Sequence, residues 1–69
     1  LVAENNGLAD INLISNQAFM IIKKGGLMIF EHGYNQSDDV KTIMTKYGFK
    51  DIKLVKDYQS QPRITLGTK

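Results

Sequence analysis

Four consecutive apolar residues, Leu27-Met28-Ile29-Phe30, constrain the fold more than any other part of this sequence. Successive side chains of a strand point to opposite faces of its sheet, so a strand without alternation must be buried on both faces. Such runs are typical of interior strands in parallel sheets that helices cover on both sides. The run ends in the polar pair Glu31-His32, where the carboxyl end of the strand meets solvent.

A segment with helical periodicity precedes this strand. Residues 8–22 carry apolar side chains at helical spacing, with Asn6 or Gly7 as the expected N-cap and Asp10 in the first turn. We expect Gly25-Gly26 to end the helix, since glycine adopts the left-handed cap conformation at little steric cost. The predicted buried face consists of Leu8, Ile11, Ile14, Ala18 and Ile21.

A second helix is predicted over residues 37–47. Ser37 is the expected N-cap, and Asp38-Asp39 suit the first turn of a helix, whose amino end carries positive partial charge. Gly48 is the expected residue just past the helix, followed by a hydrophobic contact from Phe49. The predicted apolar stripe, which we assign to the core as in the first helix, consists of Val40, Ile43, Met44 and Tyr47.

The remaining residues predict an antiparallel hairpin. Ile52 and Leu54 alternate with polar residues, residues 57–62 form a loop, and Ile64 and Leu66 alternate again up to Gly67. The predicted order is α–β–α–β–β. The hairpin can pair with one edge of strand 27–30, and no segment is predicted for the other edge. We therefore expect several parallel strands to precede this sequence, and expect the open edge to favour self-association of the chain alone.

Composition excludes several classes of protein. The 69 residues are 42% hydrophobic and 23% charged, which argues against a disordered tail. Cysteine is absent and His32 is the one histidine, which excludes a structural zinc site, and no apolar run is long enough for a membrane span. All nine basic residues lie within residues 23–69, but the lysines alternate with apolar positions, so nucleic-acid binding is disfavoured.

Glu31 and His32 are the candidate catalytic residues. They follow a strand of an open α/β sheet, where such sheets place their ligand crevice, and either side chain is suited to act as a general base or a substrate contact. The favoured alternative is a polar strand end with a capped or solvated histidine. Similarly, Asp38-Asp39 fits a helix start better than a metal site, and a salt bridge or surface role is favoured for Arg63 over anion binding. Gly25-Gly26 lacks the spacing of a phosphate-binding loop.

Three stretches of the sequence resemble the C-terminal third of HemK/PrmC-type protein-glutamine methyltransferases. They are LVAENNGLADI, GGLMIFEHGYNQ and MTKYGFKDIKLVKDYQSQPRITLG, with the EHG and RITLG motifs the most specific. One difference is Lys24, where the family often has proline. The resemblance implies a cytoplasmic enzyme that methylates the glutamine side-chain amide of the Gly-Gly-Gln motif in peptide-chain release factors, using S-adenosylmethionine on a class I, Rossmann-like fold. Residues 1–69 are then a single partial domain.

In that fold the strand order is 3-2-1-4-5-7-6, and the resemblance makes residues 27–32 the fifth strand, about 51–57 the sixth and about 63–67 the seventh. The cofactor loop, the acidic ribose ligand and the Asn-Pro-Pro-Tyr substrate motif match no stretch here. The resemblance therefore places no cofactor-binding, metal or defining catalytic residue in this segment, and implies that it is inactive alone. Alternatives are a class I methyltransferase acting on nucleic acid or another amine, and a small autonomous α/β interaction module.

Overall fold

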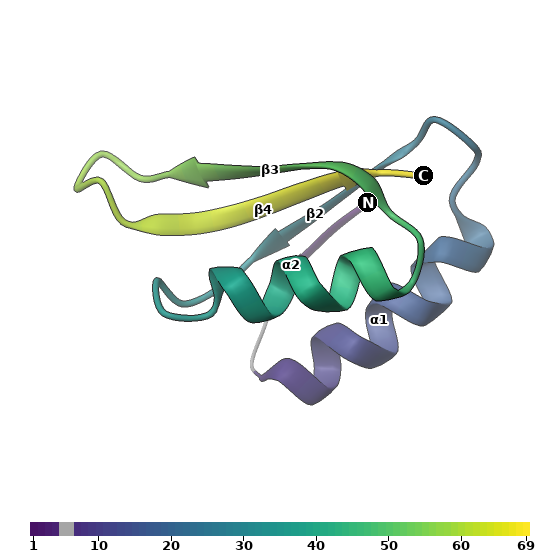
Figure 1. Ribbon diagram of the computed structural model, residues 1–69, viewed down its shortest axis with the longest axis horizontal. Coiled ribbons are helices and arrows are strands. Elements are labelled where there is room, and N and C mark those ends of the chain that lie inside the picture. The colour runs from purple at the N-terminus through teal and green to yellow at the C-terminus, as the bar shows by residue number, and fades with distance from the viewer. Residues whose placement is uncertain (5–6) are drawn as a thin grey trace.

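The computed structural model describes residues 1–4 and 7–69, and its four-stranded sheet carries both helices on one face (Figure 1). The chain is thus α/β, as predicted. In chain order the elements are β1 (Val2–Glu4), α1 (Leu8–Ile21), β2 (Leu27–Glu31), α2 (Ser37–Lys46), β3 (Lys50–Lys56) and β4 (Pro62–Thr68).

The sheet is mixed, with spatial order β1-β2-β4-β3. Strand β2 pairs in parallel with β1 and antiparallel with β4, and β3 pairs antiparallel with β4. The predicted hairpin is therefore confirmed, and its second strand lies beside β2, with Leu27 opposite Thr68 and Glu31 opposite Ile64. Because β4 separates β2 from β3, the last strand of the chain is an interior strand.

One strand of the sheet was not predicted. Strand β1 pairs with β2 from Val2 opposite Ile29 to Glu4 opposite Glu31, so the expectation that nothing in this chain occupies that edge of β2 is wrong. Three residues are too few to show an alternating pattern, which is why the sequence did not reveal the strand. Because β1 pairs with the edge of β2 that was expected to be open, this edge no longer favours self-association of the chain.

The prediction that β2 is buried on both faces is also wrong for this chain. Met28 and Phe30 are fully buried beneath the helices, whereas Leu27, on the opposite face, is 46% exposed. Among the described residues, no helix covers that opposite face. We call it the open face, and its apolar side chains come from all four strands: Val2, Leu27, Ile29, Val55, Ile64 and Leu66.

The core lies between the sheet and the two helices. Phe49, just past α2, packs edge-on against Phe19 of α1, with ring centroids 5.2 Å apart. The predicted stripe of α2 is confirmed for three of its four residues, because Val40 and Met44 are fully buried and Ile43 packs against the core. Tyr47 is instead the half-buried C-cap residue and does not belong to the core. The buried apolar residues are Ile11, Ala18, Met28, Phe30, Val40, Met44 and Phe49.

The predicted face of α1 is only partly correct. Ile11 and Ala18 are buried, but Leu8 is 36% exposed and Ile21 is 73% exposed, so these two do not belong to the core. Both lie in the end turns of a helix that packs mainly against α2. The helix end also differs from the prediction, because the C-cap is the extended residue Ile22. The two glycines instead form the following turn, with Gly25 at φ +87°.

The predicted start of α2 is off by one residue, whereas its predicted C-terminal glycine is correct. Ser37 is the first helical residue rather than the N-cap; Gln36 holds the cap position without a side-chain cap bond. At the other end Gly48 is left-handed at φ +104°, as predicted. The Gly48 N–H donates to the Thr45 carbonyl, and the Phe49 N–H donates to the Met44 carbonyl. These two bonds satisfy the final carbonyls in a Schellman motif.

The N-terminal cap of α1 is Gly7, one of the two predicted candidates, and it makes no side-chain cap bond. The other candidate, Asn6, lies outside the described residues. Neither described helix combines the length and apolar character that crossing a membrane would require.

Candidate functional site

The carboxyl end of β2 meets the amino end of β4 at one edge of the sheet. Glu31 lies opposite Ile64, and the His32 backbone N–H donates to the Arg63 carbonyl over 2.9 Å. The hairpin loop, residues 57–61, lies at the same edge because β3 and β4 are antiparallel to each other and β4 is antiparallel to β2. The EHG and RITLG motifs are therefore brought together here. We call this edge the rim.

His32 is buried at the rim, with both ring nitrogens bonded within the chain. Nδ1 lies 2.9 Å from the Gly33 carbonyl oxygen, and Nε2 lies 2.7 Å from the Thr65 hydroxyl. Since a carbonyl oxygen can only accept, Nδ1 donates to Gly33, and the Thr65 hydroxyl, which can donate or accept, is the partner of Nε2. The histidine thus ties β2 to β4. A direct role of His32 toward substrate stays a prediction.

Glu31 is exposed at the same rim. The preceding residue of the strand, Phe30, is buried beneath the helices, so the pleat directs Glu31 to the open face. Glu31 is therefore the solvent-accessible member of the predicted pair. Whether it contacts a substrate stays a prediction.

Arg63 forms a second connection at the rim. Its Nε lies 3.3 Å from the Asp57 Oδ2, which gives the salt bridge that the sequence favours. Its guanidinium carbon lies 5.6 Å from the centre of the Tyr34 ring, a cation–π distance. We call Tyr34, Asp57 and Arg63 the rim cluster. Sequence reasoning identified neither partner of Arg63, although Asp57 lies in the same resembling stretch of sequence as Arg63.

Asp57 organises the hairpin loop from its first position. Its Oδ1 accepts the backbone N–H groups of Gln59 at 2.8 Å and Gln61 at 3.0 Å. The pKa of Asp57 is lowered, chiefly by the Gln61 N–H, with further contributions from the Gln59 N–H and Arg63, all of which favour the charged carboxylate. One carboxylate therefore fixes both the loop and the arginine.

The glycine of the RITLG motif has a packing role. A Cβ on Gly67 would lie 2.8 Å from the Met44 Cε and 3.2 Å from the Phe49 Cβ. A larger residue at this position would displace the Met44 methyl group and press against Phe49, so glycine suits the close approach of β4 to α2. Three residues of the motif thus have distinct contacts: Arg63 belongs to the rim cluster, Thr65 hydrogen-bonds to His32, and Gly67 packs against α2.

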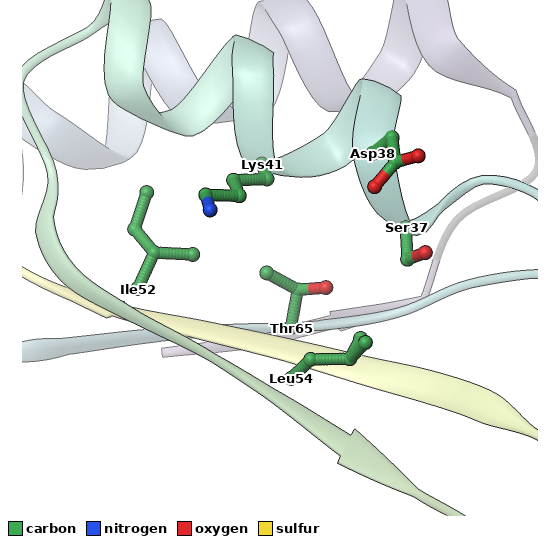
Figure 2. A pocket seen from close by; sticks show the side chains of 6 residues that line it. All are labelled: Ser37, Asp38, Lys41, Ile52, Leu54 and Thr65. Atoms are coloured by element: carbon green, nitrogen blue, oxygen red, sulfur yellow. The ribbon is translucent and has the colours of Figure 1, made fainter.

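A cavity of about 160 Å³ lies between α2 and the hairpin (Figure 2). Figure 2 shows α2 on one side of it and the β3 and β4 strands on the other; its lining residues are Ser37, Asp38, Lys41, Ile52, Leu54 and Thr65. Sites for cofactor-sized ligands enclose about 300–1,000 Å³, so this cavity does not fit S-adenosylmethionine. In the described part of the chain, no three acidic, histidine or cysteine side chains gather in a way that would hold a metal ion.

Comparison with curated proteins repeatedly finds relatives of one name, although comparison with family models finds none. No protein-family model matches the chain. A release factor glutamine methyltransferase from Vibrio cholerae is 46% identical over 67 residues, which cover 97% of this chain and 23% of that protein. Proteins of the same name from Francisella tularensis and Escherichia coli are 42% and 36% identical. This chain is a sequence relative of the release factor glutamine methyltransferases.

The resemblance predicted from the motifs is therefore confirmed. The chain spans about a quarter of the length of the release factor glutamine methyltransferases that it matches. Their similarity extends over nearly all of this chain, so it includes the rim, both helices and the hairpin.

Proposed function

We propose that this chain forms part of an S-adenosylmethionine-dependent methyltransferase whose substrate is a peptide-chain release factor. The methyl group would be transferred to the side-chain amide nitrogen of the glutamine in the Gly-Gly-Gln motif. The observation that carries the proposal is the 34–46% identity to release factor glutamine methyltransferases along almost the entire chain.

The sheet supports the same proposal. The order β2-β4-β3, with β4 antiparallel to its neighbours, is the order expected for strands 5-7-6 of a class I methyltransferase. β1 pairs with the edge of β2 at which the resemblance expects the fourth strand, but it is not followed by the Asn-Pro-Pro-Tyr motif of that strand. In the proposed protein, helices from the remaining sequence would cover the open face, which would bury the side of β2 that is exposed here.

The contribution of this segment would be positional. S-adenosylmethionine supplies an electrophilic methyl group, and the residues that hold it are expected elsewhere in the proposed protein. Within this chain, His32 and Thr65 fix the carboxyl end of β2 against β4, and thereby the rim on which Glu31 stands. The segment would thus form one wall of the active site beside the substrate amide.

The test is a methylation assay with the full-length protein that contains this chain. We expect a release factor to gain one methyl group on the motif glutamine, located by mass spectrometry, and a release factor with alanine at that glutamine to gain none. Methylation of nucleic acid or a small amine instead would contradict the release-factor proposal and favour another methyltransferase. Salt-dependent RNA binding by a folded but catalytically inactive protein would favour an interaction module.

The isolated 69-residue chain should not bind the cofactor. Its described cavity is too small for S-adenosylmethionine, and no glycine-rich cofactor loop is found in its sequence. Isothermal titration of S-adenosylmethionine into the chain should therefore give no heat of binding. A micromolar dissociation constant would contradict this prediction.

A further inference from the structure

The rim cluster holds an arginine side chain in place without burying it. Asp57 binds the Arg63 Nε, and the guanidinium lies over the Tyr34 ring, yet the arginine side chain remains 44% exposed. Asp57 is itself held by two backbone N–H groups of the hairpin loop. Arg63 is therefore preorganised, so that binding a further group would cost less side-chain entropy than it would for a mobile arginine.

The terminal nitrogens of Arg63 can still bind a further group. A guanidinium has five N–H donors in a planar fork, and the salt bridge engages the one on Nε. Within residues 1–4 and 7–69, Asp57 supplies the one side-chain acceptor of this arginine. The fork that remains matches a carboxylate or the carbonyl oxygens of a peptide chain.

Two tyrosines extend this surface. Tyr34 is 57% exposed and Tyr58, in the hairpin loop, is 96% exposed. Tyrosine and arginine are the residues, with tryptophan, that most often dominate the binding energy of protein interfaces. The rim is also the edge where open α/β sheets bind their ligands, so these side chains stand next to the place expected for the reaction.

We propose that the rim cluster together with Tyr58 is a docking surface for the polypeptide chain of the substrate protein. Arg63 binds a carboxylate or backbone carbonyl close to the methylated side chain, and the tyrosines pack against the same segment. The inference rests on the proposed function, and it deepens that function by assigning substrate contacts to this part of the chain.

Charge at the rim favours a polypeptide over a nucleic acid. Glu31 and Asp57 stand at this edge, and the first turn of α2 adds Asp38 and Asp39. Against these acidic groups, the described basic residues of the rim are Arg63 and Lys56, which lies beside Pro62. A phosphate backbone needs a contiguous basic stripe, which this mixture of charges does not provide.

The test compares Arg63→Ala with Arg63→Lys in the full-length protein. Loss of one charge-assisted hydrogen-bonding group should raise the KM for the release factor about tenfold, with kcat and the affinity for S-adenosylmethionine unchanged. Arg63→Lys should give an intermediate KM, because lysine keeps the charge but lacks the fork. Tyr58→Ala should raise the same KM by a smaller factor.

Lys46→Ala provides the matched control. Lys46 also places an exposed cation over an aromatic ring, with Nζ 5.2 Å from the centre of the Tyr47 ring. It lies in the last turn of α2, whereas the rim lies before the first turn of that helix. Its removal should leave the KM for the release factor unchanged.

The outcomes separate the two proposals. No methylation by the unsubstituted protein contradicts the proposed function, whereas normal methylation with an unchanged KM in Arg63→Ala overturns the docking surface alone. If Arg63→Ala lowers kcat and the affinity for S-adenosylmethionine together, the substitution has damaged the fold, and this result overturns a specific role of Arg63 in docking. RNA binding that depends on Arg63, with no effect on release-factor binding, overturns the choice of a polypeptide. Direct binding of the release factor without cofactor provides a readout that does not require activity.

Discussion

The two faces of the sheet carry similar side chains in different surroundings. On the helix side, Met28 and Phe30 are fully buried, while Leu27 of the same strand is 46% exposed on the open face. Sequence reasoning treated the four residues alike, because all of them are apolar. The difference shows that an apolar run does not by itself fix burial, because among the described residues the helices shield one face of β2 and not the other.

An apolar open face therefore has a meaning different from that of an exposed leucine on a helix. Single exposed apolar residues are ordinary, whereas a continuous patch marks an interface. On the open face apolar residues pair across neighbouring strands, as in Ile29 opposite Leu66 and Val55 opposite Ile64. The charged residues Lys53 and Glu31 lie on the same face and bound this apolar group. Within this chain, stability should depend mainly on the helix-covered face.

The largest expected difference between the faces comes from truncation within β2. Phe30→Ala should lower the free energy of unfolding by about 3–5 kcal/mol, because it leaves a large cavity between the sheet and the helices. Leu27→Ala, the matched change on the open face, should cost less than about 1 kcal/mol, as is usual for partly exposed sites. Urea unfolding followed by circular dichroism measures both. Equal losses would show that the open face contributes as much to stability as the helix-covered face.

The next largest effect should come from adding a methyl group on the covered side. Gly48→Ala places a Cβ 2.8 Å from the Phe19 ring at a residue whose φ is +104°. We expect a loss of about 2–3 kcal/mol in unfolding free energy from overpacking and backbone strain. Gly7→Ser is the control, because no atom lies within 4 Å of its added Cβ and serine suits an N-cap. A comparable loss in Gly7→Ser would contradict the steric explanation.

A polar change on the covered side should have a smaller effect. Thr65→Val removes the hydroxyl that binds the buried His32 Nε2, and should cost about 1–3 kcal/mol because the ring nitrogen is left without its partner. Thr65→Ser keeps the hydroxyl and should retain most of that stability. The chemical shifts of the His32 ring in NMR spectra report the same bond. Unchanged shifts and stability in Thr65→Val would show that the bond contributes nothing.

The smallest effect should be the contribution of Asp57, in the hairpin loop, to the pH dependence of the unfolding free energy. Asp57 has a lowered pKa in the folded chain, so its contribution to stability is fully present above the ordinary aspartate pKa. That contribution is lost as the pH falls through the lowered folded value. Asp57→Asn should remove this part of the pH dependence of unfolding. An identical acid profile in wild type and variant would show that Asp57 does not contribute.

The parts of the fold that were predicted depend on local patterns. The stripe of α2, with Val40 and Met44 buried, and the two alternating strands of the hairpin can be recognised within short windows. The parts that were missed depend on what surrounds an element. β1 is too short to show a period, and Leu8 and Ile21 fit the apolar pattern of α1 although both are exposed in its end turns.

The same distinction applies to the rim. The position of Glu31 and His32 followed from a strand end, which is a local signal. The partners of His32 and Arg63 could not be deduced, because Thr65 is 33 residues from His32 and Tyr34 comes from another loop. The resemblance identified the EHG and RITLG motifs, and the structure shows that they meet where His32 contacts Arg63 and Thr65.

The interior position of β4 has a consequence for how this chain folds. β4 is the last strand in chain order, yet it lies between β2 and β3 and pairs with both. During synthesis, β2 and β3 are made before β4. Because β4 lies between them, β2 and β3 cannot be joined in one sheet until β4 has been made. Such non-local pairing slows folding and leaves strand edges exposed meanwhile. Until β4 has been made, the two strand edges that it covers in the folded chain have no partner from β4.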